Sequence, residues 1–301
     1  IELSIEDIAA SSELSTWKQY FYPMRKFIAF LDEEHPPKQA HLPVKPAVIS
    51  SFLALHTRDT KSTASVGTMC SAIRHAYSVN DLTSSHLDNI FKRARGSAKR
   101  NYGKARKQKI AFTPGQIEYI MVNWGSSHCP VHRMIALLVG LCFAATLRFS
   151  DAARLCETAF TIAGPNGEDR LICITKAKND TGFVGDWRAL PARRDVPPGD
   201  LRCPVNLLEH VRAQGLGGRG LRRLFVDIKK HRWGRSPPEL DHEKDLPYEK
   251  ARQWIKLAFG TCPGVSDKDA KLAATHCCRI GSANANSRKA STTGGLNAAE
   301  L

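Results

Sequence analysis

Basic and imidazole side chains occur at three places in the second half of the sequence where a fold could hold them against a phosphate. Arg148 follows closely on the longest apolar run, so a buried helix would place it on a rigid wall. His276 and Arg279 are three residues apart, on one face of an expected helix, beside small residues that allow close approach. Lys176 and Lys178 lie at the expected tip of a pair of strands. Two arginines, a histidine and a lysine together would stabilise a phosphorane without a metal ion.

Each of these places also has an ordinary structural interpretation. Arg148 could pair with Asp151 three residues later, a hairpin lysine could be solvated, and a helical His/Arg pair is often a surface feature. Together, the three places favour a functional site, because the planar guanidinium group of arginine can donate two hydrogen bonds to phosphate oxygens. The sequence has no carboxylate cluster and no glycine-rich nucleotide-binding loop beside these residues. Arg148 and Arg279 would hold the non-bridging oxygens. His276 would donate a hydrogen bond or act as general base, and a lysine would protonate a leaving oxygen.

The segments around these residues resemble the two arginine motifs of the tyrosine recombinases, the phage-integrase family, in its Cre-like and retrotransposon-type forms. The first motif is filled by Leu147, Arg148, Ser150, Asp151 and Leu155. The second, His-x-x-Arg followed by a small aliphatic residue and a glycine, is filled by residues 276–281, about 130 residues further on. The N-terminal part, with its aromatic-rich first helix and the segment 71–75, resembles the core-binding domain of the family, so the resemblance covers nearly the whole chain.

The resemblance implies conservative, site-specific cleavage and rejoining of DNA without metal, ATP or another cofactor. In the family a tyrosine attacks the scissile phosphate and gives a 3′-phosphotyrosine and a free 5′-hydroxyl. By this resemblance Arg148 and Arg279 would stabilise the transition state, and His276 would act as acid and base. A hairpin lysine would be the general acid for the 5′ oxygen. Lys178 is preferred for its distance to the following strand, and Lys176 remains an alternative.

The nucleophile of the family has no counterpart in this sequence. The family places its tyrosine about three dozen residues after the second arginine, whereas the sequence printed here ends at Leu301. All of its tyrosines precede His276: Tyr20, Tyr22, Tyr77, Tyr102, Tyr119 and Tyr248. We therefore expect either a chain truncated before the tyrosine or a decayed copy. The alternatives are a non-catalytic DNA-binding relic, a type IB topoisomerase and, as the least specific reading, a basic protein that binds RNA.

The charge of the chain indicates a polyanionic partner. Its 301 residues include 44 Lys+Arg against 29 Asp+Glu, a formal net charge of +15, which favours nucleic acid. A run without any acidic residue is expected to lie along a phosphate backbone: Lys92, Arg93, Arg95, Lys99, Arg100, Lys104, Arg106, Lys107 and Lys109. We expect double-stranded DNA as the partner. The family resemblance adds a homotetramer on two DNA sites and a monomer without DNA.

The cysteines favour an intracellular protein. Nine cysteines, an odd number without regular spacing, argue against a secreted disulfide framework. His128, Cys129 and His132 form an incomplete ligand pattern, and we expect no metal there. No secretory signal, lipidation motif or membrane-length apolar run is found. The expected place is with DNA, in the nucleus of a eukaryote or the cytoplasm of a bacterium, and the loose motifs and many cysteines favour a eukaryotic mobile element.

The periodicity of apolar residues predicts a mainly α fold with one small antiparallel sheet. The predicted domains are a helical (SAM-like) core-binding domain over residues 1–95, a basic linker over 96–112 and an α+β catalytic domain over 113–301, incomplete at its C-terminus. A helix over residues 17–31 would start at Thr16 and be kinked or divided at Pro23. Helices are also expected over residues 46–55, 65–79, 85–95, 115–124, 132–145, 205–212 and 248–259 and from 271 onward, and strands over 159–162, 171–175 and 187–190.

Overall fold

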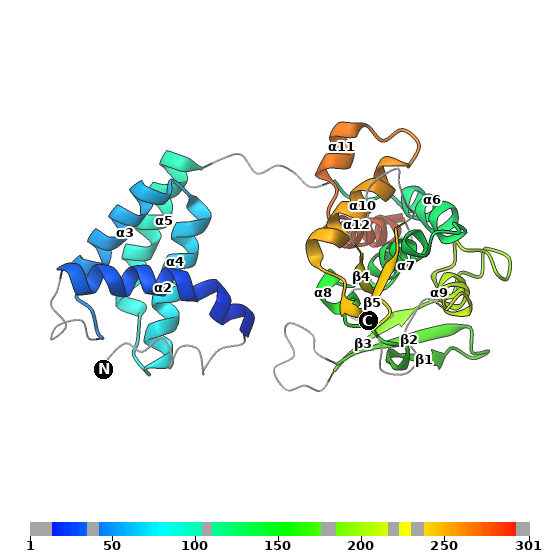
Figure 1. Ribbon diagram of the computed structural model, residues 1–301, viewed down its shortest axis with the longest axis horizontal. Coiled ribbons are helices and arrows are strands. Elements are labelled where there is room, and N and C mark those ends of the chain that lie inside the picture. The colour runs from blue at the N-terminus through cyan, green and yellow to red at the C-terminus, as the bar shows by residue number, and fades with distance from the viewer. Residues whose placement is uncertain are drawn as a thin grey trace. The chain divides into compact units, whose positions relative to one another are not determined.

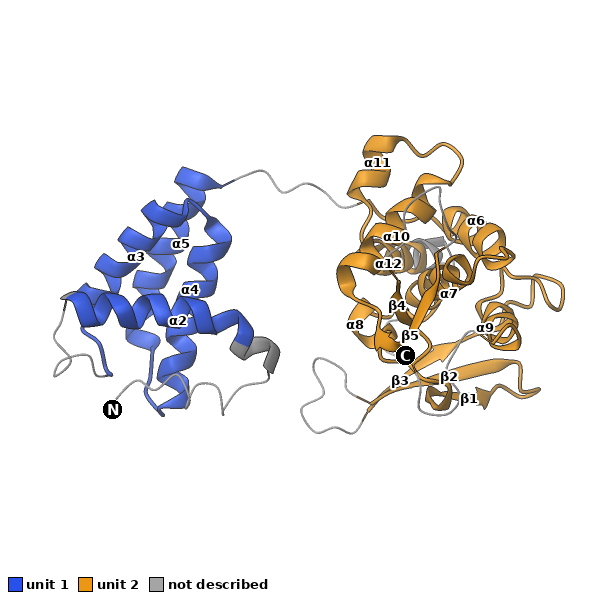
Figure 2. Cartoon of the chain, viewed as in Figure 1, with its two compact units in different colours: residues 1–106 blue, residues 107–301 orange. Residues whose placement is uncertain are grey.

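The computed structural model describes residues 14–34, 42–103, 110–175, 185–215, 223–229 and 238–292; for residues 14–17, 34 and 288–292 it describes the backbone alone. The chain divides into two compact units, residues 1–106 and 107–301 (Figure 2). Each unit has its own hydrophobic core, and the two are described separately.

Unit 1 is a bundle of helices around α4 (Figure 1). The helix α4 packs against the other three α-helices described in this unit. Its buried face carries Met69, Ile73 and Tyr77, as the apolar spacing predicts. The Tyr77 hydroxyl accepts a hydrogen bond from the Val44 N–H (3.0 Å) and donates one to the Val44 carbonyl (3.2 Å). The elements are α2 (Leu14–Glu34), α3 (Pro46–Thr60), α4 (Thr63–Val79), η2 (Ser85–Leu87) and α5 (Asp88–Tyr102).

Two helices of unit 1 differ from the sequence prediction. The helix α2 begins at Leu14 rather than at Thr16, and it contains Pro23 without being divided. The helix α5 runs through Gly96 to Tyr102, so residues 96–102 are helical and not linker. One glycine costs a helix only about 1 kcal/mol. Alanine, lysine and arginine on both sides of Gly96 are good helix formers, and Ala98 is buried in the core.

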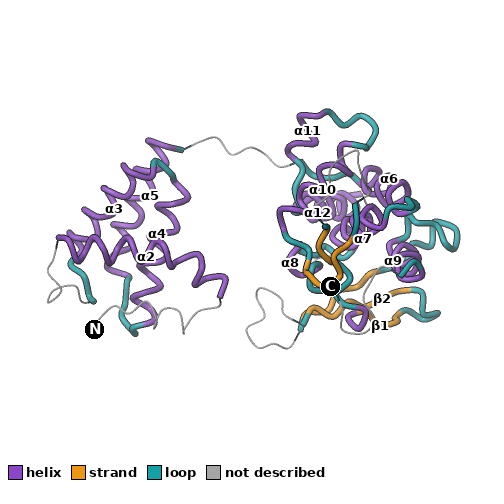
Figure 3. The backbone as a smooth tube through the Cα atoms, in the orientation of Figure 1, coloured by secondary structure: helices purple, strands orange, loops and turns teal. Residues whose placement is uncertain are grey.

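Unit 2 is built around α7, whose residues from Met134 to Cys142 are all buried. This helix packs against α6, α8, α9, α10 and α12 (Figure 3). Phe112 stacks on Phe259, with ring centroids 4.4 Å apart, so the end of the expected linker belongs to this core. The helices are α6 (Pro114–Gly125), α7 (Pro130–Ala144), α8 (Phe149–Ala152), η3 (Glu157–Ala159), α9 (Pro204–Ala213), α10 (Tyr248–Gly260), α11 (Asp267–Leu272) and α12 (His276–Thr292).

Two antiparallel sheets are described in unit 2, where the sequence predicted one. The predicted sheet has the order β1 (Phe160–Ala163), β2 (Asp169–Ile174), β3 (Asp186–Leu190), and its first turn closes through Gly164 and Gly167 with positive φ. The second sheet pairs β4 (Val226–Ile228) with β5 (Leu240–Asp245). Apolar alternation does not predict β5, because its sequence, LDHEKD, is mostly charged and its outer residues form ion pairs.

The fold class is therefore as predicted: mainly helical, with a small antiparallel sheet inserted in the second unit. All nine cysteines lie in the described part of the chain, and none of the nine is in a disulfide bond. Among the described helices, none has both the length and the apolar character to span a bilayer.

Candidate active site

Arg148 lies at a sharp turn between the central helix and α8. The helix α7 ends at Ala144, Thr146 adopts a left-handed conformation (φ +53°), and Arg148 is the N-cap of α8. The Arg148 carbonyl accepts the N–H groups of Asp151 (3.0 Å) and Ala152 (2.9 Å). A left-handed backbone is strained for a β-branched residue and persists only where the surroundings hold it. The backbone of Arg148 is therefore fixed in place.

The Arg148 guanidinium has no hydrogen-bond or ion-pair partner among the described residues, although it is half-buried. Asp151 is buried and accepts a hydrogen bond from the Ser150 hydroxyl (3.3 Å), and it forms no ion pair with Arg148. The structural pair that the sequence allowed is thus not formed. Other arginines of unit 2 do pair with carboxylates: Arg170, Arg188, Arg193, Arg194, Arg202, Arg212, Arg223 and Arg252.

The helix α12 carries His276 and Arg279, three residues apart as predicted. His276 is exposed at the start of the helix and Arg279 is half-buried, while Cys277 and Cys278 between them are fully buried. The helix is held by the Phe112 N–H, which donates to the Cys277 carbonyl (3.2 Å). Gly281 makes this approach possible, because an added Cβ would lie 2.0 Å from the Phe112 carbonyl oxygen. At Gly281 the small residue thus allows the Phe112 backbone to pack directly on α12.

A hydrogen bond joins the Arg148 turn to the Arg279 helix. The Thr146 hydroxyl lies 3.1 Å from that of Ser282, which is 2% exposed. The buried thiols of Cys142 on α7 and Cys278 on α12 also interact electrostatically. Burial raises the pKa of Cys142 to about 12, with a contribution from the Asp151 charge, and burial raises the pKa of Cys278 with a contribution from Cys142. Arg279 has no ion-pair or hydrogen-bond partner within the described residues either.

The hairpin lysines Lys176 and Lys178 lie outside the described residues, in the connection between β2 and β3. The base of this hairpin is described: Ile174 pairs with Asp186 across it. A small cavity of about 110 Å³ is lined by Asp151 of α8 on one side and by Cys173, Ile174 and Thr175 on the other. The base of the lysine hairpin therefore lies beside the helix that Arg148 caps.

The part of the basic run that the structure describes is a helical surface. Lys92, Arg93, Arg95, Lys99 and Arg100 are exposed on α5, whereas Lys104, Arg106, Lys107 and Lys109 lie outside the described residues. An open groove of about 510 Å³ is lined by Asn89, Lys92, Arg93, Gly96 and Arg100. These positions repeat every three or four residues and share one face of the helix.

The incomplete ligand pattern at residues 128–132 has a structural role. The His132 ring packs on Trp124, with centroids 4.2 Å apart, and its Nδ1 lies 3.1 Å from the Ser127 hydroxyl. Burial lowers the pKa of His132. Across the described segments, no group of three or more His, Cys, Asp or Glu side chains is placed to hold a metal ion.

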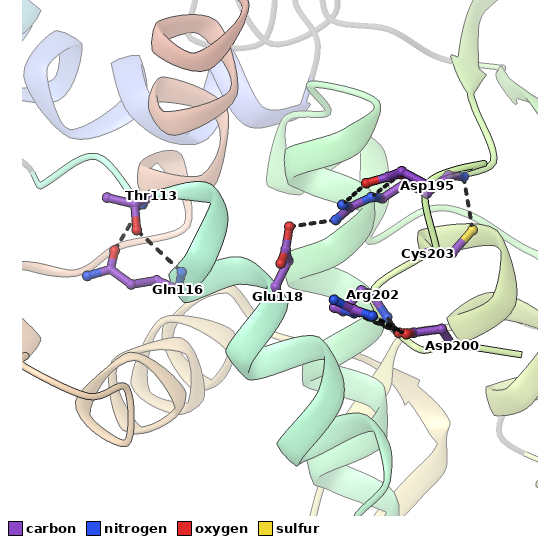
Figure 4. Close-up of polar contacts among 8 residues, drawn as sticks. Thr113, Gln116, Glu118, Asp195, Asp200, Arg202 and Cys203 are labelled. Atoms are coloured by element: carbon purple, nitrogen blue, oxygen red, sulfur yellow. Dashed lines mark hydrogen bonds and ion pairs between the residues drawn. The ribbon is translucent and has the colours of Figure 1, made fainter. Parts of the chain in front are cut away.

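A larger open cavity of about 850 Å³ lies between α6, α7 and α12. Ion pairs lie along its rim (Figure 4). Arg193 forms ion pairs with Glu118 (2.5 Å) and with Asp195, and Arg202 forms one with Asp200 (2.6 Å). The Arg193 hydrogen bond lowers the pKa of Asp195 to about 2. Arginines on this rim are neutralised by carboxylates, in contrast to Arg148 and Arg279.

The sequence pattern predicts no side-chain contact within the site for Thr146, Ser282 or Tyr248. Thr146 and Ser282 join the two motifs, and the Tyr248 ring meets the Phe149 ring edge-on at 5.4 Å. Tyr248 is also the first residue of α10 after Pro247, as expected. No spacing in the sequence indicates these contacts, because they depend on how α8, α10 and α12 pack.

Comparison with known proteins defines the fold. No family model and no curated protein matches the sequence. Among solved structures, the XerH site-specific recombinase bound to palindromic difH substrate, a post-cleavage complex, has a TM-score of 0.56 and 15% identity. The XerH pre-cleavage complex with difH substrate has a TM-score of 0.53 and 13% identity. In both, the match covers 93% of this chain and 71% of the recombinase. The chain therefore shares the fold of the XerH site-specific recombinase, in agreement with the fold class that the two arginine motifs led us to expect.

Proposed function

We propose that the chain is a DNA-binding protein of the tyrosine-recombinase type, in which Arg148 and Arg279 hold one phosphate of double-stranded DNA. The hydrogen bond between Thr146 and Ser282 carries this proposal, because it joins the two motifs that contribute the arginines. Both guanidinium groups are half-buried and without a carboxylate partner in the described part of unit 2. A buried guanidinium without an anion is costly, so an anion from outside the protein is the natural partner.

The remaining roles follow from the chemistry of strand cleavage. His276, exposed beside Arg279, would act as hydrogen-bond donor or general base. A lysine of the β2–β3 connection, Lys178 or Lys176, would protonate the departing 5′ oxygen. A tyrosine hydroxyl would form the bond to phosphorus as the bond to the 5′ oxygen breaks, leaving a 3′-phosphotyrosine. No metal or ATP is required in this scheme, because the guanidinium groups supply the positive charge.

Unit 1 would act as the core-binding domain, and the exposed cations of α5 would contact the DNA backbone. The groove over Lys92, Arg93, Gly96 and Arg100 has no acidic lining residue. Each cation that neutralises a phosphate releases counterions and steepens the dependence of affinity on salt. In this proposal unit 2 is the catalytic domain, four protomers act on two DNA sites, and a single chain is monomeric without DNA, inside the cell where DNA is found.

A second candidate function is DNA binding without strand cleavage. It needs only Arg148 and Arg279, which have no carboxylate partner among the described residues and can bind a phosphate whether or not a strand is cut. The protein would then keep the phosphate-binding arginines as part of a DNA-binding surface and form no covalent bond to DNA.

Covalent trapping separates the two candidates. The full chain is incubated with 5′-labelled duplexes of random sequence that carry nicks, and the products are separated in detergent. Strand cleavage predicts a labelled adduct that is lost in Arg148→Ala and Arg279→Ala, while mobility shifts show that both variants still bind DNA. Binding without any adduct supports the second candidate. Adducts at normal yield in both variants contradict the site assignment.

A further inference from the structure

An exposed tyrosine lies beside the Arg148 turn. Tyr248 is the first residue of α10 and 41% of its surface is accessible. Its ring meets the ring of Phe149 edge-on, with centroids 5.4 Å apart and planes at 73°. Phe149 directly follows Arg148 and is only 8% exposed. The tyrosine is thus set against a buried residue of the same turn that presents the unpaired guanidinium.

The position of Tyr248 is fixed from several sides. Pro247 precedes it as the N-cap of α10 and restricts the backbone there. Two residues further on, the Lys250 ammonium donates to the Asp227 carboxylate (2.7 Å) and to the Ile228 carbonyl. Asp227 is itself buried, at 8% exposure. This ion pair ties the first turn of α10 to the sheet strand β4, so Tyr248 is held firmly while part of its surface faces solvent.

The chemistry of a rigid, exposed tyrosine suits a nucleic-acid backbone. The phenol can donate to a phosphate oxygen, and the ring can cover the sugar beside it. Tyrosine hydroxyls are among the ordinary donors to DNA phosphates. The neighbouring acid does not add free negative charge, because Glu249 pairs with Arg252 (2.6 Å).

We infer that Tyr248 contacts the DNA strand next to the phosphate that Arg148 holds, with its hydroxyl donating to a non-bridging oxygen of a neighbouring phosphate. The inference rests on the proposed function, since it takes Arg148 as a phosphate ligand. It adds a DNA contact from α10 to those proposed for the Arg148 turn, α12, α5 and the β2–β3 connection.

Two variants of the full chain test the inference. Tyr248→Phe removes the hydroxyl and keeps the ring on Phe149, so the melting temperature should not change. Its affinity for a pool of random-sequence duplexes, measured by fluorescence anisotropy, should fall about three- to tenfold. A photoreactive benzoylphenylalanine at position 248 should crosslink to the duplex. The same residue at position 257 is the matched control, because Leu257 lies on the same helix and is 39% exposed.

The outcomes also separate this inference from the proposed function. An unchanged affinity of Tyr248→Phe, or crosslinking at 248 no stronger than at 257, overturns the contact. If Arg148→Ala weakens binding in that experiment and Tyr248→Phe does not, only the contact from α10 is lost. If neither Arg148→Ala nor Tyr248→Phe changes binding, the proposed phosphate site itself fails.

Discussion

Gly281 is the position where a single added methyl group should push α12 away from the Phe112 backbone. An added Cβ would lie 2.0 Å from the Phe112 carbonyl oxygen, 3.0 Å from its carbon and 3.1 Å from the Phe112 nitrogen. A carbon–oxygen contact needs about 3.3 Å, so α12 and the 112 backbone must move apart by about 1 Å or more. The atoms that clash belong to the backbone, so no side chain can turn away to relieve the overlap.

The size of the effect follows from three contributions. Overpacking of a well-packed site costs about 1–3 kcal/mol. Separating the segments breaks the bond from the Phe112 N–H to the Cys277 carbonyl, worth about 0.5–1.5 kcal/mol. Alanine returns about 1 kcal/mol of helix propensity. We therefore expect Gly281→Ala to lower the free energy of unfolding of unit 2 by about 1–3 kcal/mol, a fall of about 3–10 °C in its melting temperature.

Thermal unfolding followed by tryptophan fluorescence measures this change, since all tryptophans except Trp17 lie in residues 107–301. Gly115→Ala in α6 is the matched control, because no atom lies within 4 Å of its added Cβ. The control should melt at the wild-type temperature or slightly above. If the melting temperature of Gly281→Ala equals that of Gly115→Ala, the close approach of α12 to Phe112 is refuted.

Three further predictions test the surroundings of the site. Thr146→Val and Ser282→Ala should each lower the free energy of unfolding of unit 2 by about 1–3 kcal/mol. In a double-mutant cycle measured by denaturant unfolding, the double variant should lose clearly less than the sum of the two single losses. Additive losses would argue against the hydrogen bond. The thiol of Cys142, with its pKa raised to about 12 by burial, should not react with a thiol reagent at pH 8 in the folded protein, and labelling faster than unfolding would contradict its burial. Burial lowers the pKa of His132 below its ordinary value of 6.5, so the folded protein binds a proton at this histidine less readily than the unfolded protein does. Stability should therefore be full above pH 6.5 and decrease as pH falls through that value, less so in His132→Gln, and equal pH profiles of the two proteins would contradict this.

Apolar periodicity predicted most helices because each has a buried face with the right spacing. The helix α6 begins at Pro114, one residue before the predicted start, and its N-cap Thr113 forms both hydrogen bonds of a capping box with Gln116 (2.9 and 3.3 Å). The extension of α5 past Gly96 was not predictable from local signals, because burial of Ala98 compensates for the glycine. The strand β5 was missed because its residues are charged and are held by tertiary pairing.

Motif spacing predicts Arg148, His276 and Arg279 as site residues, and this assignment stays a prediction. The contacts between the two motifs could not be predicted from the sequence. The bond between Thr146 and Ser282 joins residues 136 positions apart, and no local pattern indicates which hydroxyls meet at that separation. The same holds for Tyr248, whose neighbour Phe149 is distant in sequence and close only because α10 packs on the core.

The measurement that tests the central claim most directly is a double-mutant cycle on DNA affinity. Wild type, Arg148→Ala, Arg279→Ala and the double variant are titrated with the same duplex pool at one salt concentration. Arg194→Ala, a 70% exposed arginine paired with Glu168, serves as the control partner in a parallel cycle with Arg148→Ala. If the two arginines hold one phosphate, the double variant should lose less than the sum of the single losses, with a coupling of about 0.5–3 kcal/mol. Additive losses, equal to those of the control cycle, would contradict a shared phosphate.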